Sequence, residues 1–173
     1  LAENAPTAEE QTNAYFWLAR TYEENLQDYQ NAVANYEKVI SLGTSDDMTA
    51  RSLYYSGVLY SKELKDDEKS LAALQELANR FSAEEGADIK MMVTDANLRV
   101  PELLVSLGKF GDAVTRAKKV RDDALAGDNA EEKVNAQYQL AYLLGEQAGQ
   151  AADSGSPDPD LSREAAAEYE KVY

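Results

Sequence analysis

Cysteine and histidine, two residue types on which much of protein chemistry depends, are both absent from this chain of 173 residues. Their absence excludes disulfides, thiolate nucleophiles, zinc sites with Cys or His ligands, and Ser-His or Cys-His pairs. Glycine-rich phosphate loops and the Gly-x-Ser-x-Gly turn of hydrolases are missing as well. No apolar run approaches roughly 18 residues, so no membrane-spanning helix is predicted. We therefore expect no catalytic residue, no cofactor and no metal, and predict that the chain is not an enzyme.

Positive charge is scarce. The chain has 17 Lys and Arg against 32 Asp and Glu, which gives a net charge of -15. A strongly acidic chain repels phosphate backbones and anionic lipid surfaces, so we expect no nucleic-acid partner and no membrane insertion. The charge favours a basic protein or peptide partner, although an acidic surface also serves solubility alone.

Helical periodicity dominates what is present. Apolar residues recur at three- and four-residue steps, and period-two β-branched runs are absent. The pattern predicts eight helices at about 8–25, 29–42, 47–63, 67–80, 87–107, 110–126, 129–148 and 161–173. Short connections predict antiparallel neighbours. The segment 149–160, rich in Gly, Ser, Pro and Asp, is expected to be an exposed loop.

Several helix ends carry recognisable signals. Capping boxes are predicted at Thr7–Glu10 and Ser82–Glu85, and a carboxylate cap at Asp128 with Glu131 three residues on. Helices are expected to end near Gly43, Gly108 and Gly127, where a left-handed residue costs little.

Two blocks of sequence recur in the same order. Residues 13–19 read Asn-Ala-Tyr-Phe-Trp-Leu-Ala, and residues 135–141 read Asn-Ala-Gln-Tyr-Gln-Leu-Ala. Further on, Tyr-Glu-Lys-Val occurs at 36–39 and again at 169–172, each time with an Ala four residues before the Tyr (Ala32 and Ala165). Matched blocks in one order indicate an internal helical repeat.

In this pattern the sequence resembles the tetratricopeptide repeat family. The first unit matches with Tyr15, Leu18, Ala19, Tyr22, Tyr29, Ala32, Tyr36 and Val39, and weaker matches follow along nearly the whole chain. The resemblance implies an all-α solenoid of about four helical hairpins in a single domain, with repeats at about 8–44, 46–82, 86–127 and 128–173. In this family a small residue lets the two helices of a hairpin approach closely.

The chain departs from the family's period of 34 residues. The small positions on the first helix of each hairpin are spaced 38, 44 and 40 residues apart, at Ala19, Gly57, Pro101 and Ala141. Longer turns or helices are therefore expected. A proline inside a helix removes a backbone hydrogen bond and clashes with the preceding turn, so we expect a kink or a break near 98–101.

The resemblance also implies where a partner would bind. In this family the first helices line a concave face, and the matching positions lie three before and one after each small position. This predicts a partner-binding set of Phe16, Arg20, Tyr54, Val58, Leu98, Glu102, Tyr138 and Tyr142. Four members of the set could instead pack between successive helices: Phe16, Tyr54, Leu98 and Tyr138. The positions where chaperone-binding members clamp a carboxylate hold Phe16, Arg20, Tyr55, Asp95 and Arg99, which are too few donors, so no binding of that chaperone tail is expected.

Acidic pairs are frequent but have a structural reading. Most of them lie near predicted helix ends, where carboxylates in a first turn stabilise the helix dipole. The oxygens of the segment 153–160 could suit calcium, but the Glu and spacing of an EF-hand loop are missing, and a solvated linker fits better.

The sequence predicts a protein-interaction scaffold or adaptor, with a regulatory or structural spacer region of a larger protein as the alternative. Leu1 at the start and a helical pattern running to Tyr173 suggest a piece of a longer chain. An uncapped terminal repeat would expose apolar surface and favour self-association. The compartment stays open between the cytoplasm and the periplasm or cell envelope of a bacterium.

Overall fold

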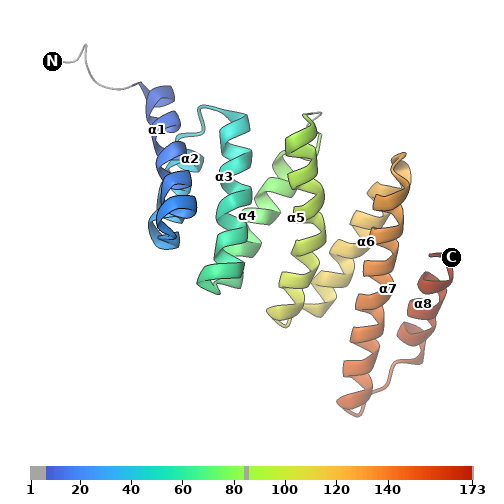
Figure 1. Cartoon of the computed structure of the whole chain (residues 1–173). Helices are drawn as coiled ribbons and strands as arrows, with labels where there is room; N and C mark the ends of the chain where they lie inside the picture. The colour runs from blue at the N-terminus through green and yellow to red at the C-terminus, as the bar shows by residue number, and fades with distance from the viewer. Residues whose placement is uncertain (1–6, 84–85, 173) are drawn as a thin grey trace. The chain divides into compact units, whose positions relative to one another are not determined.

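A computed structural model describes residues 7–83 and 86–172, and these form α-helices and two π-helical turns without any strand (Figure 1). In chain order the elements are α1 (Ala8–Thr21), η1 (Tyr22–Leu26), α2 (Tyr29–Leu42), α3 (Asp46–Leu59), η2 (Tyr60–Leu64), α4 (Asp67–Arg80), α5 (Ala87–Ser106), α6 (Phe110–Ala126), α7 (Ala130–Asp153) and α8 (Pro159–Glu170). The all-α class is confirmed. None of the helices in this described part is long and apolar enough to cross a membrane.

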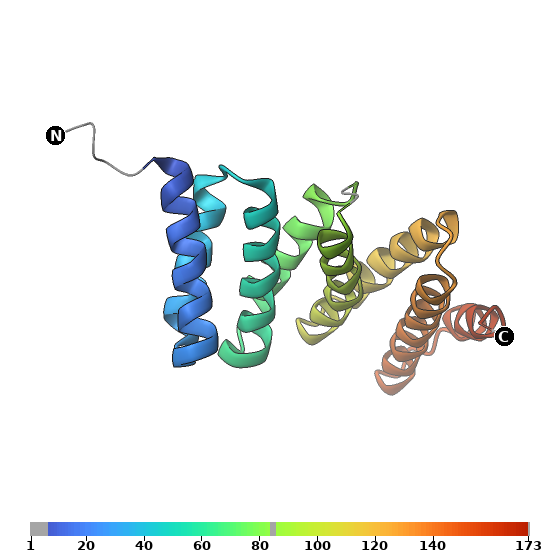
Figure 2. The same ribbon diagram turned by 45° about the horizontal axis from the view of Figure 1, so that its top comes forward.

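The chain forms two compact units, Leu1–Asn97 and Leu98–Tyr173, and the division falls within α5. In the first unit α1 packs on α2, α2 on α3, and α3 on α4. In the second unit α6 packs on α7 and α7 on α8. Figures 1 and 2 both show α2 beside α1 and α4 beside α3. Helices thus pack on their neighbours in sequence, as the expected helical hairpins require.

Side-chain caps start most of these helices. Thr7 accepts a hydrogen bond from the Glu10 backbone N–H at 3.1 Å, and Glu10 accepts one from the Thr7 N–H at 2.8 Å, which confirms the first capping box. Residues 84 and 85 of the second predicted box lie outside the described residues. The third prediction was wrong by one residue, because Asn129 rather than Asp128 caps α7, accepting from the N–H groups of Glu131 and Glu132.

A similar turn closes the first helix of three hairpins. In two of them a π-helical turn ends at a left-handed residue, Gln27 (φ 52°) or Lys65 (φ 56°), and an Asp then caps the next helix. In the third, Gly108 takes the left-handed position (φ 72°). The π-turns extend the first helices of these two hairpins to Leu26 and Leu64. A left-handed conformation disfavours residues with a Cβ, so Gln27 and Lys65 are mildly strained.

Three predicted features differ in the structure. Gly127 ends α6 with an extended rather than a left-handed backbone (φ -82°, ψ -174°). Helix α7 continues to Asp153, so the loop is shorter than expected; the segment just beyond 148 is rich in alanine, the best helix former. Pro101 lies inside a continuous α5, so of the predicted kink or break the break is wrong, and the kink stays a prediction. Its ring is fully buried, which offsets part of the cost of the missing hydrogen bond.

Small residues are buried where the two helices of a hairpin meet. Ala19 and Ala141 are fully buried, and so is Ala32 on a second helix. At Gly57 a Cβ atom would stand 2.7 Å from the Cγ and Cδ2 atoms of Leu74, so α3 and α4 approach too closely there for any larger residue. The small positions thus allow the close contact that the repeat pattern predicts.

Candidate protein-binding surface

The predicted binding residues divide between the units. Phe16, Arg20, Tyr54 and Val58 belong to the first unit, and Leu98, Glu102, Tyr138 and Tyr142 to the second. All eight lie on the first helices of hairpins, α1, α3, α5 and α7. The predicted set therefore consists of two groups of four residues, one group in each unit.

The aromatic positions of the first unit are used in packing. Phe16 is 6% exposed and packs at 6.0 Å against Tyr36 of α2, with the two rings edge to face. Tyr54 is half-buried, and its hydroxyl donates a 2.9 Å hydrogen bond to Asp95 on α5. Both contacts stabilise neighbouring helices, so Phe16 in particular offers a partner little surface.

Arg20 is held in place from two directions. Its guanidinium forms ion pairs with Glu23, at 3.1 Å, and with Glu24. The same group stacks 4.3 Å from the ring centroid of Tyr55 on α3, a cation–π contact. Val58 follows Tyr55 by about one helical turn on α3 and is half-buried. A fixed and partly exposed Arg is a residue type that anchors interfaces.

Acidic side chains also neutralise Arg51, on α3 of the first unit. Arg51 pairs with Asp47 at 2.9 Å and with Asp88 of α5 at 3.1 Å. The hydrogen bonds that Arg51 donates to these two carboxylates raise the pKa of Arg51 above its ordinary value. Arg20 and Arg51 thus both have carboxylate partners, which lowers their attraction for an acidic ligand.

In the second unit two tyrosines stand out from α7. Tyr138 is 54% exposed and Tyr142, one turn further on, is 47% exposed. Tyr138 meets Tyr169 of α8 edge to face, with 5.9 Å between the ring centroids. Burial and the nearby Tyr138, Tyr142 and Glu146 raise the pKa of Tyr169. These side chains therefore form a small aromatic surface with an acidic edge.

The remaining two predicted residues of the second unit lie on α5. Leu98 is half-buried, and its backbone carbonyl accepts a 2.6 Å hydrogen bond from the side-chain amide of Gln139 on α7. Glu102 is exposed. The bond from Gln139 joins α5 to α7 and so fixes the position of both helices within this unit.

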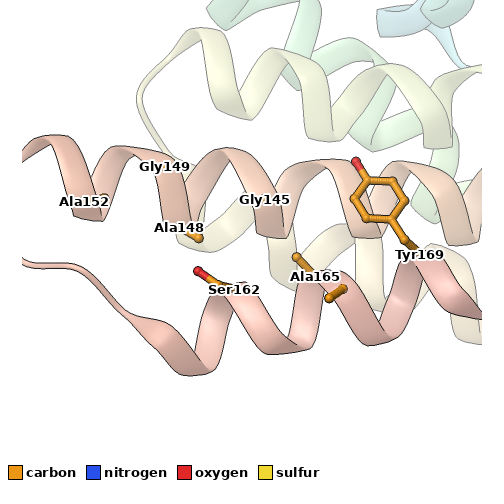
Figure 3. A pocket seen from close by; sticks show the side chains of 8 residues that line it. Gly145, Ala148, Gly149, Ala152, Ser162, Ala165 and Tyr169 are labelled. Atoms are coloured by element: carbon orange, nitrogen blue, oxygen red, sulfur yellow. The ribbon is translucent and has the colours of Figure 1, made fainter.

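A shallow groove of about 410 Å³ runs between α7 and α8, next to the aromatic surface (Figure 3). Its walls are mostly small residues, and Tyr169 closes one end, with its side chain extending from α8 towards α7. The lining residues are Gly145, Ala148, Gly149, Ala152, Ser162, Ala165, Ala166 and Tyr169. The groove is mainly apolar and could take an apolar side chain rather than a charged one.

Sequence reasoning missed two surface aromatics. Tyr169 belongs to the repeated Tyr-Glu-Lys-Val block but is not in the predicted binding set. Trp17, the only tryptophan, is 63% exposed, and the neighbouring Leu18 is 42% exposed. Trp17 lies two residues before the small position Ala19, as Tyr55 lies two residues before Gly57. This match could have indicated from the sequence that Trp17 occupies a helix-packing position.

The acidic pairs and the 153–160 segment have structural roles. Asp158 caps α8 by accepting hydrogen bonds from the N–H groups of Asp160 and Leu161, at 3.0 and 3.2 Å. Asp160 pairs with Arg163 at 2.8 Å. Within residues 7–83 and 86–172, no group of three or more acidic side chains is placed as metal ligands would be.

Comparison with known proteins identifies the repeat. Residues 13–42 and 51–83 match the model of the tetratricopeptide repeat. These two stretches are tetratricopeptide repeats. They correspond to the α1–α2 and α3–α4 hairpins of the first unit. Tetratricopeptide repeats are generally protein–protein interaction modules, built from stacked helical hairpins.

Solved structures extend the likeness to the whole chain. Two crystal structures of a putative kinesin light chain from Podosopora anserina with nearly identical TPR-like repeats, one of them of a point variant, are similar in fold. Each has a TM-score of 0.63 and 16% identity, and the match covers 99% of this chain and 81% of the other. At this identity the likeness establishes the fold class, a TPR-like α-solenoid, and nothing about ligands. No curated protein matches the chain.

Proposed function

We propose that this chain is a scaffold or adaptor that binds a protein or peptide partner through the first helices of its hairpins. The observation that carries the proposal is the pair of exposed tyrosines, Tyr138 and Tyr142, on α7. Exposed tyrosines one helical turn apart give a partner a large, rigid contact area with polar tips. Tyr and Arg are also the residue types that contribute most to binding at interfaces.

The partner proposed is basic. The chain has a net charge of -15, and the acidic edge of the aromatic surface is formed by Glu146. In the first unit Arg20 and Arg51 are already paired with carboxylates. A partner carrying Lys or Arg would gain attraction from the whole molecule and cation–π contact with the tyrosine rings.

The proposal is tested by binding to an array of basic, neutral and acidic peptides, with Tyr142→Ala beside the wild type. The matched control is Leu125→Ala on α6, another large residue of the same unit that is 51% exposed. We expect wild type and control to bind basic peptides alike and Tyr142→Ala to lose about tenfold in affinity. Added salt should weaken this binding.

Equal affinity of Tyr142→Ala and wild type for every peptide that binds would remove α7 from the site. The alternative function, a spacer or regulatory region of a larger protein, predicts no peptide binding by any of the three proteins. Circular dichroism on each variant checks that the helices are intact.

A further inference from the structure

The outer face of α1 has the character of a helix-packing face. Trp17 and Leu18 lie two and one residues before the small position Ala19, and both are exposed. The residues at these two positions of α3 are Tyr55 and Ser56. Tyr55 packs at 5.8 Å on Tyr36 of α2, and Ser56 is fully buried.

The corresponding face of α7 is buried too. There Leu140, one residue before the small position Ala141, is fully buried, and Gln139, two residues before it, is half-buried, in a helix that packs on α6. In α3 and α7 this face meets the helix that precedes it in the chain. In α1 the same face is apolar but lies open to solvent along the described residues.

A complementary face lies open on α8. Val33 of α2, Leu71 of α4 and Val114 of α6 each follow a small residue of a second helix, and all three are buried. On α8 the residue at this position is Ala166, which is exposed. Tyr169 is likewise half-exposed, whereas its counterpart in α2 is fully buried beneath α3.

We propose that α1 of one copy of this chain packs on α8 of a second copy, with Trp17 of the one against Tyr169 of the other. Between copies, α1 packs on α8 in the way that α3 packs on α2 within one copy. Side-chain sizes compensate between the two faces. On α1, Trp17 replaces a tyrosine and Leu18 replaces a serine, so that face is larger than its α3 counterpart.

On α8 the side chains at the matching positions are smaller than those of α2. Ala166 stands in place of a valine and Ser162 in place of Tyr29, so that face is smaller. A larger face and a smaller face on one chain keep the summed volume of the interface close to that of the internal pair, as good packing requires. This complementarity is the reason for assigning the contact to a second copy.

The contact is head to tail, so each added copy leaves one α1 face and one α8 face free. Such heterologous contacts produce growing chains of copies rather than a closed dimer, unless the rotation closes a ring. The net charge of -15 opposes association at low ionic strength. Because the proposed interface is mainly apolar, added salt should strengthen self-association, opposite to its effect on a basic partner.

The single tryptophan makes the contact measurable. We expect the fluorescence maximum of Trp17 to shift to shorter wavelength as protein concentration rises, with a parallel rise in average mass by sedimentation. Ala166→Arg should abolish both changes, because it places a charge in the interface at an exposed position that the fold tolerates. The matched control is Ala167→Arg on α8. Its counterpart Ala34 stays exposed in α2 even with α3 in place, so this variant should behave as wild type.

A mixing experiment tests the direction of the contact. Trp17→Ala keeps an intact α8 face, and Ala166→Arg keeps an intact α1 face. Each variant alone should be monomeric, and their mixture should form a dimer that grows no further and shifts the tryptophan emission of Ala166→Arg. Association of Ala166→Arg with itself would overturn the proposal, because it would show a contact that does not use α8.

A wild type that stays monomeric with unchanged emission up to its solubility limit would also overturn it, and would leave both faces to other segments or proteins. The result is separable from partner binding. Tyr142→Ala tests the peptide surface on α7, whereas Trp17→Ala, on α1 of the first unit, should abolish self-association and leave peptide binding at α7 unchanged.

Discussion

The same pair of aromatic rings occurs in both units of the molecule with different surroundings. In the first unit Phe16 and Tyr36 meet at 6.0 Å with 65° between the ring planes, and both are buried. In the second unit Tyr138 and Tyr169 meet at 5.9 Å and 68°, yet Tyr138 is largely exposed. The geometry of the hairpin is therefore kept while the burial of its residues changes.

The difference arises from what covers each pair. Helix α3 packs on α2 and places Tyr55 on the ring of Tyr36. No helix in the described part of the chain follows α8. In a stacked repeat each hairpin buries its neighbour's apolar face, so Tyr138 and Tyr169 are more exposed than their counterparts where no described helix covers them.

Truncating the two tyrosines should give the largest contrast. Tyr36→Ala removes a fully buried ring whose hydroxyl donates a 2.5 Å hydrogen bond to Glu23, and should cost about 4 kcal/mol of unfolding free energy. Tyr169→Ala should cost about 1 kcal/mol because the ring is already half in water. Urea unfolding followed by circular dichroism measures both. Similar losses for the two variants would contradict the comparison.

The small positions provide a second contrast. Gly57→Ala should destabilise the chain by about 2 kcal/mol, since the added Cβ would stand 2.7 Å from Leu74. Its counterpart in α7 is Ala141, which fits without a clash. As control, Gly149→Ala adds a Cβ to open space within α7 and should stabilise by about 0.5–1 kcal/mol. Thermal unfolding measures both variants. Equal stability of Gly57→Ala and Gly149→Ala would contradict the close approach of α3 and α4.

A buried acid in the second unit occupies a repeat position that is neutral in the first. Glu168 accepts hydrogen bonds from Gln137 and Lys171 and pairs with Arg121 at 3.2 Å. Its counterpart in α2, Asn35, is neutral and donates to the Asn31 carbonyl at 2.7 Å. Burial alone would raise the pKa of Glu168, but hydrogen bonds from Lys171 and Gln137 and the charges of Lys171 and Arg121 hold it below the ordinary 4.5.

The pKa of Glu168 is lower in the folded chain than in the unfolded chain. Ionised Glu168 therefore stabilises the fold at pH values above its unfolded-state pKa, and this stabilisation is lost as the pH falls through its folded-state pKa. Glu168→Gln should cost about 1–2 kcal/mol at neutral pH and little in acid. Hydrogen exchange of α8 amides across pH measures this. An unchanged pH profile in Glu168→Gln would show that other groups hold α8.

The turns give the smallest expected effect. Gln27→Gly relieves a left-handed backbone and should stabilise by up to about 1 kcal/mol, and Gly108→Ala should destabilise by a similar amount. Chemical unfolding of the two variants tests the equivalence of the turns. A stability change of the same sign in both would contradict it.

Much of the fold follows from the sequence. The limits of α2, α4 and α6 agree with those predicted, and α2 has a strong local signal at each end, the Asp28 cap and the left-handed Gly43. The errors fall where tertiary contacts outweigh local preference. Pro101 stays helical because its ring is buried, and α7 extends through Gly149 because the helix packs on α8.

The candidate surface could be predicted only in part. The pattern places Phe16 and Tyr138 at one repeat position, but it does not indicate which neighbours cover each. That depends on which helix follows, so Phe16 is buried and Tyr138 exposed although both occupy the position. Binding by each of the eight predicted residues stays a prediction.

Tyrosine nitration mapped by mass spectrometry at low protein concentration tests the central comparison most directly. Reaction requires access and the phenolate form, and burial and Glu23 raise the pKa of Tyr36 well above its ordinary value. We predict rapid modification of Tyr138 and Tyr142, slower modification of Tyr169, and almost none at Tyr36. Nitration of Tyr36 as fast as that of Tyr138 in the folded protein would contradict the account.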